Sequence, residues 1–201
     1  YAEADFEQPH NQFIQRIVTF VRDPGFSGKV LDLGCGSGDI SVRMAKAFPL
    51  CHCDAIDGSK PMLDYAKNSV PSELQHRLNF VHGKLPFFKL PESSYDIIIS
   101  NSLLHHLPDP HILWQTIKNY AQTGTHIAVM DLLRPHSIAM AKRFVTSYAV
   151  NEPEILQRDF YYSLLAAFTI EEINLQLNQA ELPLTAEQIS DRHVFISGIV
   201  N

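Results

Sequence analysis

The segment 30–39 limits the possible folds more than any other part of the sequence. A short apolar run, 29–33, leads into three glycines at alternate positions, Gly34, Gly36 and Gly38. Glycine permits a sharp turn and lets a ligand approach the backbone closely. Apolar residues then recur at helical spacing over 39–48. The segment therefore predicts a strand, a glycine turn and a helix whose N-terminus can bind an anionic group.

Short apolar runs and amphipathic stretches continue to alternate along the chain. Strands are predicted at 29–33, 51–56, 78–82, 95–100 and 125–131, and helices at 6–21, 39–48, 59–70 and 109–122. Ser59 and Asp109 are the expected caps of the last two helices. Strands alternating with helices predict a parallel sheet covered on both faces.

The last third of the chain follows a different pattern. Helices are predicted at about 137–150 and 153–167, and a third begins at Thr169, which forms a capping box with Glu172. Two runs, 184–189 and 193–200, then predict strands joined by a tight turn, hence an antiparallel pair at one edge. We expect a doubly wound, seven-stranded, mostly parallel α/β sheet of Rossmann-like type with an antiparallel C-terminal edge strand.

Asp57 ends the second predicted strand, nineteen residues after Gly38. A carboxylate at this position can accept hydrogen bonds from both hydroxyls of a ribose. The glycine turn and Asp57 together predict an adenosine-containing cofactor bound beyond the carboxyl ends of the strands. The dinucleotide fingerprint requires a glycine where this chain has Asp39, which argues against NAD or FAD. A Walker loop is excluded because no Gly-Lys-Ser/Thr follows.

Charge and cysteine content narrow the class of protein further. Asp and Glu total 22 against 16 Lys and Arg, a net charge of −6. This balance argues against broad nucleic-acid binding and against a polybasic membrane anchor. No apolar run approaches the ~18 residues of a membrane span, and the N-terminal residues do not resemble a signal peptide. Three cysteines, an odd and sparse count, indicate a reducing compartment such as the cytoplasm. We expect no metal, because 51–53 has no second cysteine pair to complete a zinc site.

Four segments in order resemble the motifs of the class I S-adenosylmethionine-dependent methyltransferases. Segment 32–38 (DLGCGSG) resembles the first motif, and 55–59 (AIDGS) resembles the second. Segment 81–85 (VHGKL) falls where that family lines the adenine, and 95–107 (YDIIISNSLLHHL) resembles the fourth-strand motif. The resemblance covers roughly 29–131. Two departures are Lys84, where the family often has Asp, and 121–124 (AQTG) in place of a Lys-Pro-Gly-Gly turn.

The resemblance implies S-adenosylmethionine as cofactor, S-adenosylhomocysteine as product, and a role for each matched position. The glycine turn would hold the aminocarboxypropyl tail, and Asp57 the ribose. Asn101, Ser102 and His106 would lie by the methionyl amine. The implied cofactor-binding residues are Asp32, Gly34, Cys35, Gly36, Gly38, Asp57, Gly58, Met62, Gly83, Lys84, Leu85, Asn101, Ser102 and His106.

Residues for the acceptor side follow from position and residue type. His105 is the candidate general base, because the first of the paired histidines should face the acceptor while His106 faces the cofactor. Asp131, at the end of the fifth predicted strand, is a second candidate catalytic residue. The candidate substrate contacts are His10, Phe13, Arg134, Arg158, Tyr161 and Tyr162. For each of these residues packing, capping or a salt bridge is the alternative.

The sequence thus predicts one methyltransferase domain over 1–201. Its parts are an N-terminal helical cap (1–28), a cofactor-binding core (29–131), a helical substrate region (132–182) and a C-terminal β-hairpin (183–201). We expect in-line methyl transfer to a small-molecule acceptor, with no nucleic-acid partner. Two alternatives are a catalytically silent S-adenosylmethionine-binding module and a nicotinamide-dependent oxidoreductase. The acceptor atom and the oligomeric state stay open.

Overall fold

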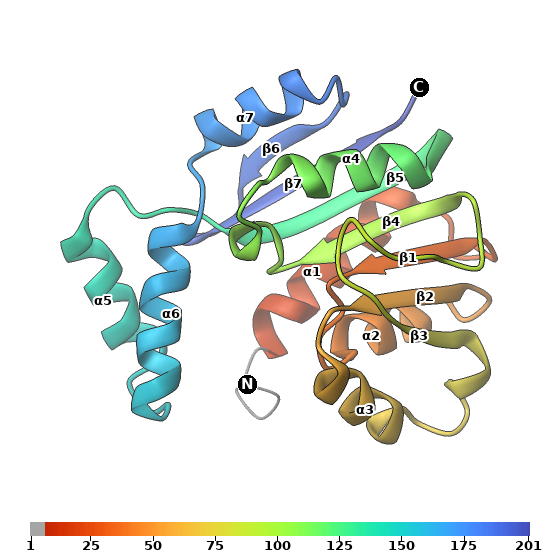
Figure 1. Cartoon of the computed structure of the whole chain (residues 1–201), viewed down its shortest axis with the longest axis horizontal. Helices are drawn as coiled ribbons and strands as arrows, with labels where there is room; N and C mark the ends of the chain where they lie inside the picture. The colour runs from red at the N-terminus through yellow and green to blue at the C-terminus, as the bar shows by residue number, and fades with distance from the viewer. Residues whose placement is uncertain (1–6) are drawn as a thin grey trace.

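Seven strands form one sheet in the order β3-β2-β1-β4-β5-β7-β6 (Figure 1). The structure is a computed structural model and describes residues 7–201, so the first six residues of the expected cap, including Phe6, lie outside the described residues. Neighbouring strands from β3 to β5 are parallel, whereas β7 is antiparallel to both β5 and β6. The predicted fold class is confirmed. The strands are β1 (Lys29–Leu33), β2 (His52–Asp57), β3 (Leu78–His82), β4 (Tyr95–Asn101), β5 (Ala121–Leu132), β6 (Thr185–Gln188) and β7 (His193–Ile199).

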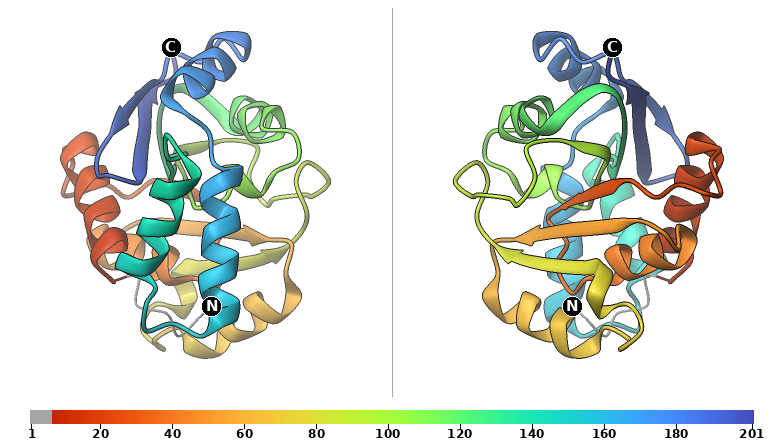
Figure 2. Two further views of the ribbon diagram at one scale, coloured as in Figure 1. Left: turned by 90° about the vertical axis from the view of Figure 1, so that its left-hand side faces the viewer. Right: turned by 90° about the vertical axis from the view of Figure 1, so that its right-hand side faces the viewer.

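Helices cover both faces of the sheet and one of its ends. They are α1 (Glu7–Val21), α2 (Asp39–Ala47), α3 (Lys60–Ser69), α4 (His111–Tyr120), α5 (Ile138–Tyr148), α6 (Glu154–Ala166) and α7 (Ile170–Gln179), with short 3-10 turns η1 (Gln75–Arg77) and η2 (Leu104–His106). The α5–α6 pair lies beyond the carboxyl ends of the parallel strands (Figures 1 and 2). It has its own small apolar cluster, made with Leu132 at the end of β5.

Two larger apolar clusters fill the faces of the sheet. One joins α1, α2 and α3 to the sheet and contains Phe13, Ile17 and Met44, all fully buried. The other joins α4 and α7 to the opposite face, with Trp114 at its centre and its indole N–H donating to Gln176 at 2.9 Å. Burial of this apolar surface from both sides is the main source of stability for a parallel sheet.

The elements match the predicted ranges closely, with differences at two ends. Strand β5 begins at Ala121 instead of 125, because Ala121 pairs with Tyr95 and the bend is taken up at Gly124, with φ of 92°. Helix α4 begins at His111, and Asp109 accepts the His111 N–H at 3.0 Å while Pro110 occupies the cap position. The predicted capping box of Thr169 and Glu172 is confirmed.

Candidate functional site

The glycine turn joins β1 to α2 in the conformation that its sequence requires. Gly34, Gly36 and Gly38 all have positive φ, at 75°, 53° and 81°. The N–H groups of Gly34 and Cys35 both donate to the carbonyl oxygen of Ile56, at 2.9 and 3.0 Å. A Cβ on Gly34 would lie 2.9 Å from the side chain of Leu103. The turn is therefore closed against the ends of β2 and β4, and only glycine fits its first position.

Asp57 connects this turn to the next loop. One carboxylate oxygen accepts the N–H of Gly36 at 2.8 Å, and the other accepts the N–H of Ser59 at 2.7 Å. Ser59 occupies the cap position of α3 as expected, but its side chain makes no capping bond. The carboxylate is half-buried and held by two backbone donors, and each oxygen retains a lone pair for one further donor. This geometry suits two adjacent hydroxyl groups.

The implied adenine-side residues surround the same loop. The methyl group of Met62 lies 3.5 Å from the Cβ position of Gly36, and the side chain of Lys84 lies 3.8 Å from that of Gly58. Gly83 donates its N–H to the backbone oxygen of Asp57 at 3.0 Å. The side chain of Leu85 packs partly buried against the α4–α7 cluster. These residues come from the ends of β2 and β3 and from the first turn of α3.

Asp32 lies beneath the turn, with 1% of its surface exposed. It accepts a hydrogen bond from the Ser41 hydroxyl at 2.6 Å. Burial raises its pKa to about 7, a shift that the Ser41 bond opposes and the nearby Asp57 charge increases. Burial likewise raises the pKa of the Cys35 thiol, so this cysteine is uncharged near neutral pH.

The carboxyl end of β4 carries two unusual features. Ser102 has φ of 55°, although it is not a glycine. A serine in this region costs free energy, and such strain tends to occur at functional sites. The Nδ2 atom of Asn101 lies 3.3 Å from Nε2 of His10, while its buried Oδ1 has no hydrogen-bond partner among the described residues.

His105, in the middle of η2, and Asp131, near the end of β5, form a buried pair. His105 Nδ1 lies 2.6 Å from one carboxylate oxygen of Asp131, and their side chains are 3% and 2% exposed. The carboxylate also accepts the N–H groups of Leu104 at 2.8 Å and Leu132 at 2.7 Å. Asp131 thereby fixes both the short helix and the tautomer of His105, which leaves Nε2 as a lone-pair acceptor.

His106 lies next to this pair but on the exposed side of η2. Its ring centroid is 4.0 Å from that of His105. Burial, followed by the neighbouring His105, lowers the pKa of His106. The imidazole is therefore neutral near pH 7 and can accept a hydrogen bond.

The predicted substrate contacts do not gather in one place. The prediction for Phe13 is wrong, because its side chain is fully buried and packs edge-on against Phe195. Arg134 is paired with Glu172, the capping residue of α7. Arg158 and Tyr162 are exposed on α6, and Tyr161 packs partly buried against the α5–α6 cluster. Their role as acceptor contacts stays a prediction.

His10 lies closer to the cofactor side than to the predicted acceptor side. Its Nδ1 is 2.7 Å from a carboxylate oxygen of Asp39, the first residue of α2, and its Nε2 faces Asn101. The sequence analysis missed the Asp39–His10–Asn101 connection. A polar residue directly after the glycine turn and a histidine in the first helix were the only signals for it, and they are far apart in the chain.

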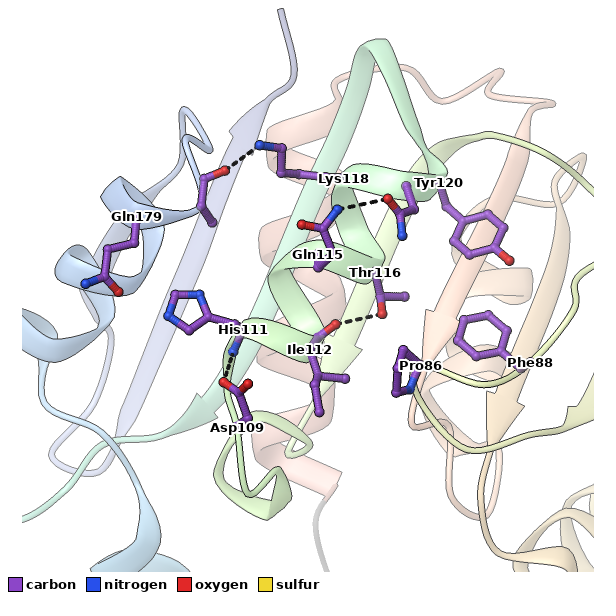
Figure 3. Close-up of a pocket in the computed structure, with 12 residues that line it drawn as sticks. Pro86, Phe88, Asp109, His111, Ile112, Gln115, Thr116, Lys118, Tyr120 and Gln179 are labelled. Carbon is purple, nitrogen blue, oxygen red and sulfur yellow. Dashed lines mark hydrogen bonds between the residues drawn. The ribbon is translucent and has the colours of Figure 1, made fainter.

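A separate surface hollow of about 580 Å³ lies against α4 (Figure 3). It is lined by Pro86, Phe88, Asp109, His111, Ile112, Gln115, Thr116, Lys118, Asn119, Tyr120, Gln179 and Ala180. Several of its polar side chains already bond to neighbours, among them Lys118 to the Ala180 carbonyl oxygen at 2.8 Å. It shares no residue with the glycine turn, so we place the candidate site at the strand ends instead.

Among residues 7–201, no cluster of three or more histidine, cysteine or acidic residues has the geometry of a metal site. No described helix combines the length and apolar character needed to cross a membrane.

Comparisons with known proteins agree with this arrangement. Residues 30–124 match the family model of a methyltransferase domain. An uncharacterized methyltransferase of Mycobacterium tuberculosis is 27% identical over 106 residues, which cover 53% of this chain and 51% of that protein. The trans-aconitate 2-methyltransferase of an Enterobacter species is 34% identical over 84 residues, 42% of this chain and 31% of that protein. The chain thus spans about half the length, or less, of these curated relatives.

Solved structures share the fold over almost the whole chain. The plantazolicin methyltransferase BpumL, solved with a triazolic desmethylPZN analog and S-adenosylhomocysteine, aligns with a TM-score of 0.71 at 15% identity, over 99% of this chain and 87% of that one. A SAM-dependent methyltransferase from Aquifex aeolicus aligns with a TM-score of 0.68 at 16% identity, over 94% and 89%. The motifs, the sheet order and the family match over residues 30–124 together identify a class I S-adenosylmethionine-dependent methyltransferase domain in this chain.

Proposed function

We propose that this chain transfers a methyl group from S-adenosylmethionine to a small-molecule acceptor. The observation that carries the proposal is the Asp57 carboxylate, fixed by the N–H groups of Gly36 and Ser59 with lone pairs left for two hydroxyls. A ribose offers two such hydroxyls side by side. The unpartnered Oδ1 of Asn101 supplies an acceptor for an ammonium group. The residues present therefore fit the cofactor.

Bound S-adenosylmethionine supplies an electrophilic methyl group on a sulfonium, with a thioether as leaving group. The chain's own task is to hold the cofactor, align the acceptor and exclude water. The glycine turn and Asn101 would bind the amino acid tail, and Met62 and Leu85 would contact the adenine side. Lys84 is exposed beside Gly58 and contributes its backbone.

His105 accepts the acceptor's proton in this proposal. As the acceptor's nucleophilic atom took the methyl group and the carbon–sulfur bond broke, its proton would pass to Nε2 of His105. Asp131 receives no proton; it keeps Nδ1 as the donor and so keeps Nε2 basic. His105 is nearly buried, and α6 packs over η2. This arrangement favours a small acceptor, or a small group that projects from a larger one, over a broad surface.

The class of acceptor draws support from the relatives. Trans-aconitate is a small molecule, and the plantazolicin enzyme was solved with small azole-containing analogues. Another relative, 38% identical over 86 residues, is a glutamine methyltransferase of ribosomal protein uL3, so the relatives also include an enzyme with a protein acceptor. The acidic net charge makes nucleic acid the least suitable acceptor.

We also propose that the cap, core, helical region and hairpin act as one domain. The helical region 132–182 packs over the β4–β5 end of the site, where Arg158, Tyr161 and Tyr162 are the proposed acceptor contacts. The three cysteines are free and buried, which supports a reducing compartment, the cytoplasm, as the site of action.

The direct test is transfer of label from methyl-labelled S-adenosylmethionine to a panel of small carboxylic acids, phenols and amines. The proposal expects label in at least one acceptor with the wild-type chain and a loss of at least about a hundredfold in rate with His105→Ala. Cofactor binding without transfer to any acceptor would instead identify a catalytically silent module.

A further inference from the structure

The imidazole ring of His10 links α1 to the start of α2 and to the end of β4, beside the proposed cofactor site. His10, in the first turns of α1, contacts Asp39 at the start of α2 through Nδ1 and Asn101 at the end of β4 through Nε2, at 2.7 and 3.3 Å. Its side chain is 17% exposed. Both ring nitrogens are therefore engaged by groups that flank the glycine turn. This placement differs from the sequence-based expectation of an acceptor contact.

The charge of Asp39 decides which nitrogen of His10 carries a proton. Burial raises the pKa of Asp39, but hydrogen bonds from His10 and Arg43 outweigh it and hold the pKa at about 2. A carboxylate can only accept, so Nδ1 of His10 donates to it. Nε2 then carries a lone pair and accepts a hydrogen bond from Nδ2 of Asn101. The orientation of the Asn101 amide follows from this chain of donors.

The oxygen atom of the Asn101 side-chain amide takes no part in these hydrogen bonds. Oδ1 of Asn101 is buried and has no partner in the part of the chain that the structure describes. Buried polar atoms without a partner are rare in folded proteins, and each needs an explanation. A donor brought by the ligand would satisfy Oδ1, and in the proposed function the cofactor's α-ammonium would be that donor.

We propose that His10 is a positioning residue that presents Asn101 Oδ1 to the α-ammonium of the cofactor and so makes binding selective for ligands that carry this group. The inference rests on the proposed function, because it takes the ligand to be S-adenosylmethionine or S-adenosylhomocysteine. His10 does not touch the ligand in this account. Without His10, no acceptor holds the NH₂ group of Asn101. The amide can then turn and present NH₂ instead of Oδ1 to the ammonium group.

The test compares two ligands that differ only in the amine. One is S-adenosylhomocysteine, and the other is its analogue with hydrogen in place of the α-amino group. Calorimetry gives a Kd for each, without any need for an acceptor. The wild-type chain should bind S-adenosylhomocysteine about tenfold or more tightly than the analogue. His10→Ala should reduce that preference to about threefold or less, mainly by weakening S-adenosylhomocysteine.

Three variants separate positioning from packing. In His10→Gln the side-chain amide can donate to Asp39 and accept from Asn101, so the preference for the amine should return. His10→Leu keeps apolar volume but removes both bonds, and it should behave like His10→Ala even if the alanine variant is unstable. Asn11→Ala is the matched control: Asn11 also ties α1 to α2, through Arg43, but it does not contact Asn101. Its preference for the amine should equal that of the wild type.

The outcomes distinguish this inference from the proposed function. If His10→Ala and His10→Leu weaken both ligands by the same factor, His10 only helps α1 to pack, and the inference is overturned. If the glutamine variant does not regain the preference, the donor–acceptor chain is wrong. If the wild-type chain binds neither ligand, the proposed function itself fails.

Discussion

Two aspartates at the carboxyl edge of the sheet use the same chemistry in opposite settings. Asp57, the last residue of β2, and Asp131, near the end of β5, each accept hydrogen bonds from two backbone N–H groups. Asp57 is half-buried and retains acceptor capacity, whereas Asp131 is 2% exposed and accepts from His105 as well. Burial decides the role: the accessible carboxylate can bind a ligand, and the sealed one orients another side chain.

The difference extends to the regions around them. The β1–β2 end is built from one contiguous stretch, in which the turn and the acidic residue lie within about thirty residues of each other. The β4–β5 end combines η2 with a residue 26 positions later and is covered by α6. We expect variants at the first end to change cofactor affinity and variants at the second to change turnover.

The largest expected effect is that of His105→Ala. Loss of the base should lower kcat by roughly 10²- to 10⁴-fold and leave the Kd for S-adenosylhomocysteine within about twofold of wild type. Single-turnover kinetics gives the rate of transfer, and calorimetry gives the Kd. His106→Ala is the comparison variant, and its effect should fall on cofactor affinity instead of on turnover at saturation. A collapse of affinity with turnover preserved at saturation would mean that the two histidines have the reverse roles.

The next effect concerns stability and the buried Asp32. Its pKa is about 7 in the folded chain, against 3.8 for an aspartate side chain in its ordinary, solvated state. A carboxyl group with a raised folded pKa stabilises the fold at low pH, and this contribution is lost as the pH rises from about 4 to about 7. The shift corresponds to about 4 kcal/mol.

Asp32→Asn removes this titration and keeps an oxygen for the Ser41 hydroxyl. The stability of the ligand-free variant relative to wild type should be greater at pH 8 than at pH 5, by up to about 3 kcal/mol, because about two pH units of the titration lie between pH 5 and the folded pKa. Urea unfolding at the two pH values measures it. An equal difference between the two proteins at both pH values would contradict the burial argument.

Asp57→Ala should weaken S-adenosylhomocysteine binding by about 1.5–3 kcal/mol, because charge-assisted hydrogen bonds to the ribose are lost. Asp64→Ala is the matched control, since Asp64 is an exposed aspartate on α3 paired only with Lys60 among the described residues. Its affinity should equal that of wild type. Unchanged affinity in Asp57→Ala would reject the ribose assignment and, with it, the contrast between the two aspartates.

The smallest expected effect is that of Arg134→Ala. Arg134 pairs with Glu172 while both side chains remain partly exposed, at 36% and 43%, and such pairs contribute less than about 1 kcal/mol. The free energy of unfolding should fall by no more than that, with acceptor KM unchanged. A large rise in KM would return Arg134 to the set of substrate contacts.

The features that the sequence could predict are those formed by residues close together in the chain. The strand–turn–helix of the glycine segment, the position of Asp57 and the antiparallel edge pair follow from local patterns, and the structure has them. The fully buried Phe13 could not be distinguished from a pocket residue, because an amphipathic helix does not show which partner its apolar face meets. The Asp39–His10–Asn101 connection joins residues up to 91 positions apart, and no local pattern reports such a contact.

The central claim is that the glycine turn and Asp57 bind S-adenosylmethionine. A thermal-shift titration of the wild-type chain with S-adenosylmethionine, S-adenosylhomocysteine and NAD tests it most directly. Ligand at a hundred times its Kd should add about 2.7 kcal/mol to stability. The account predicts stabilisation by the first two ligands and none by NAD. Stabilisation by NAD alone, or by none of the three, would contradict it.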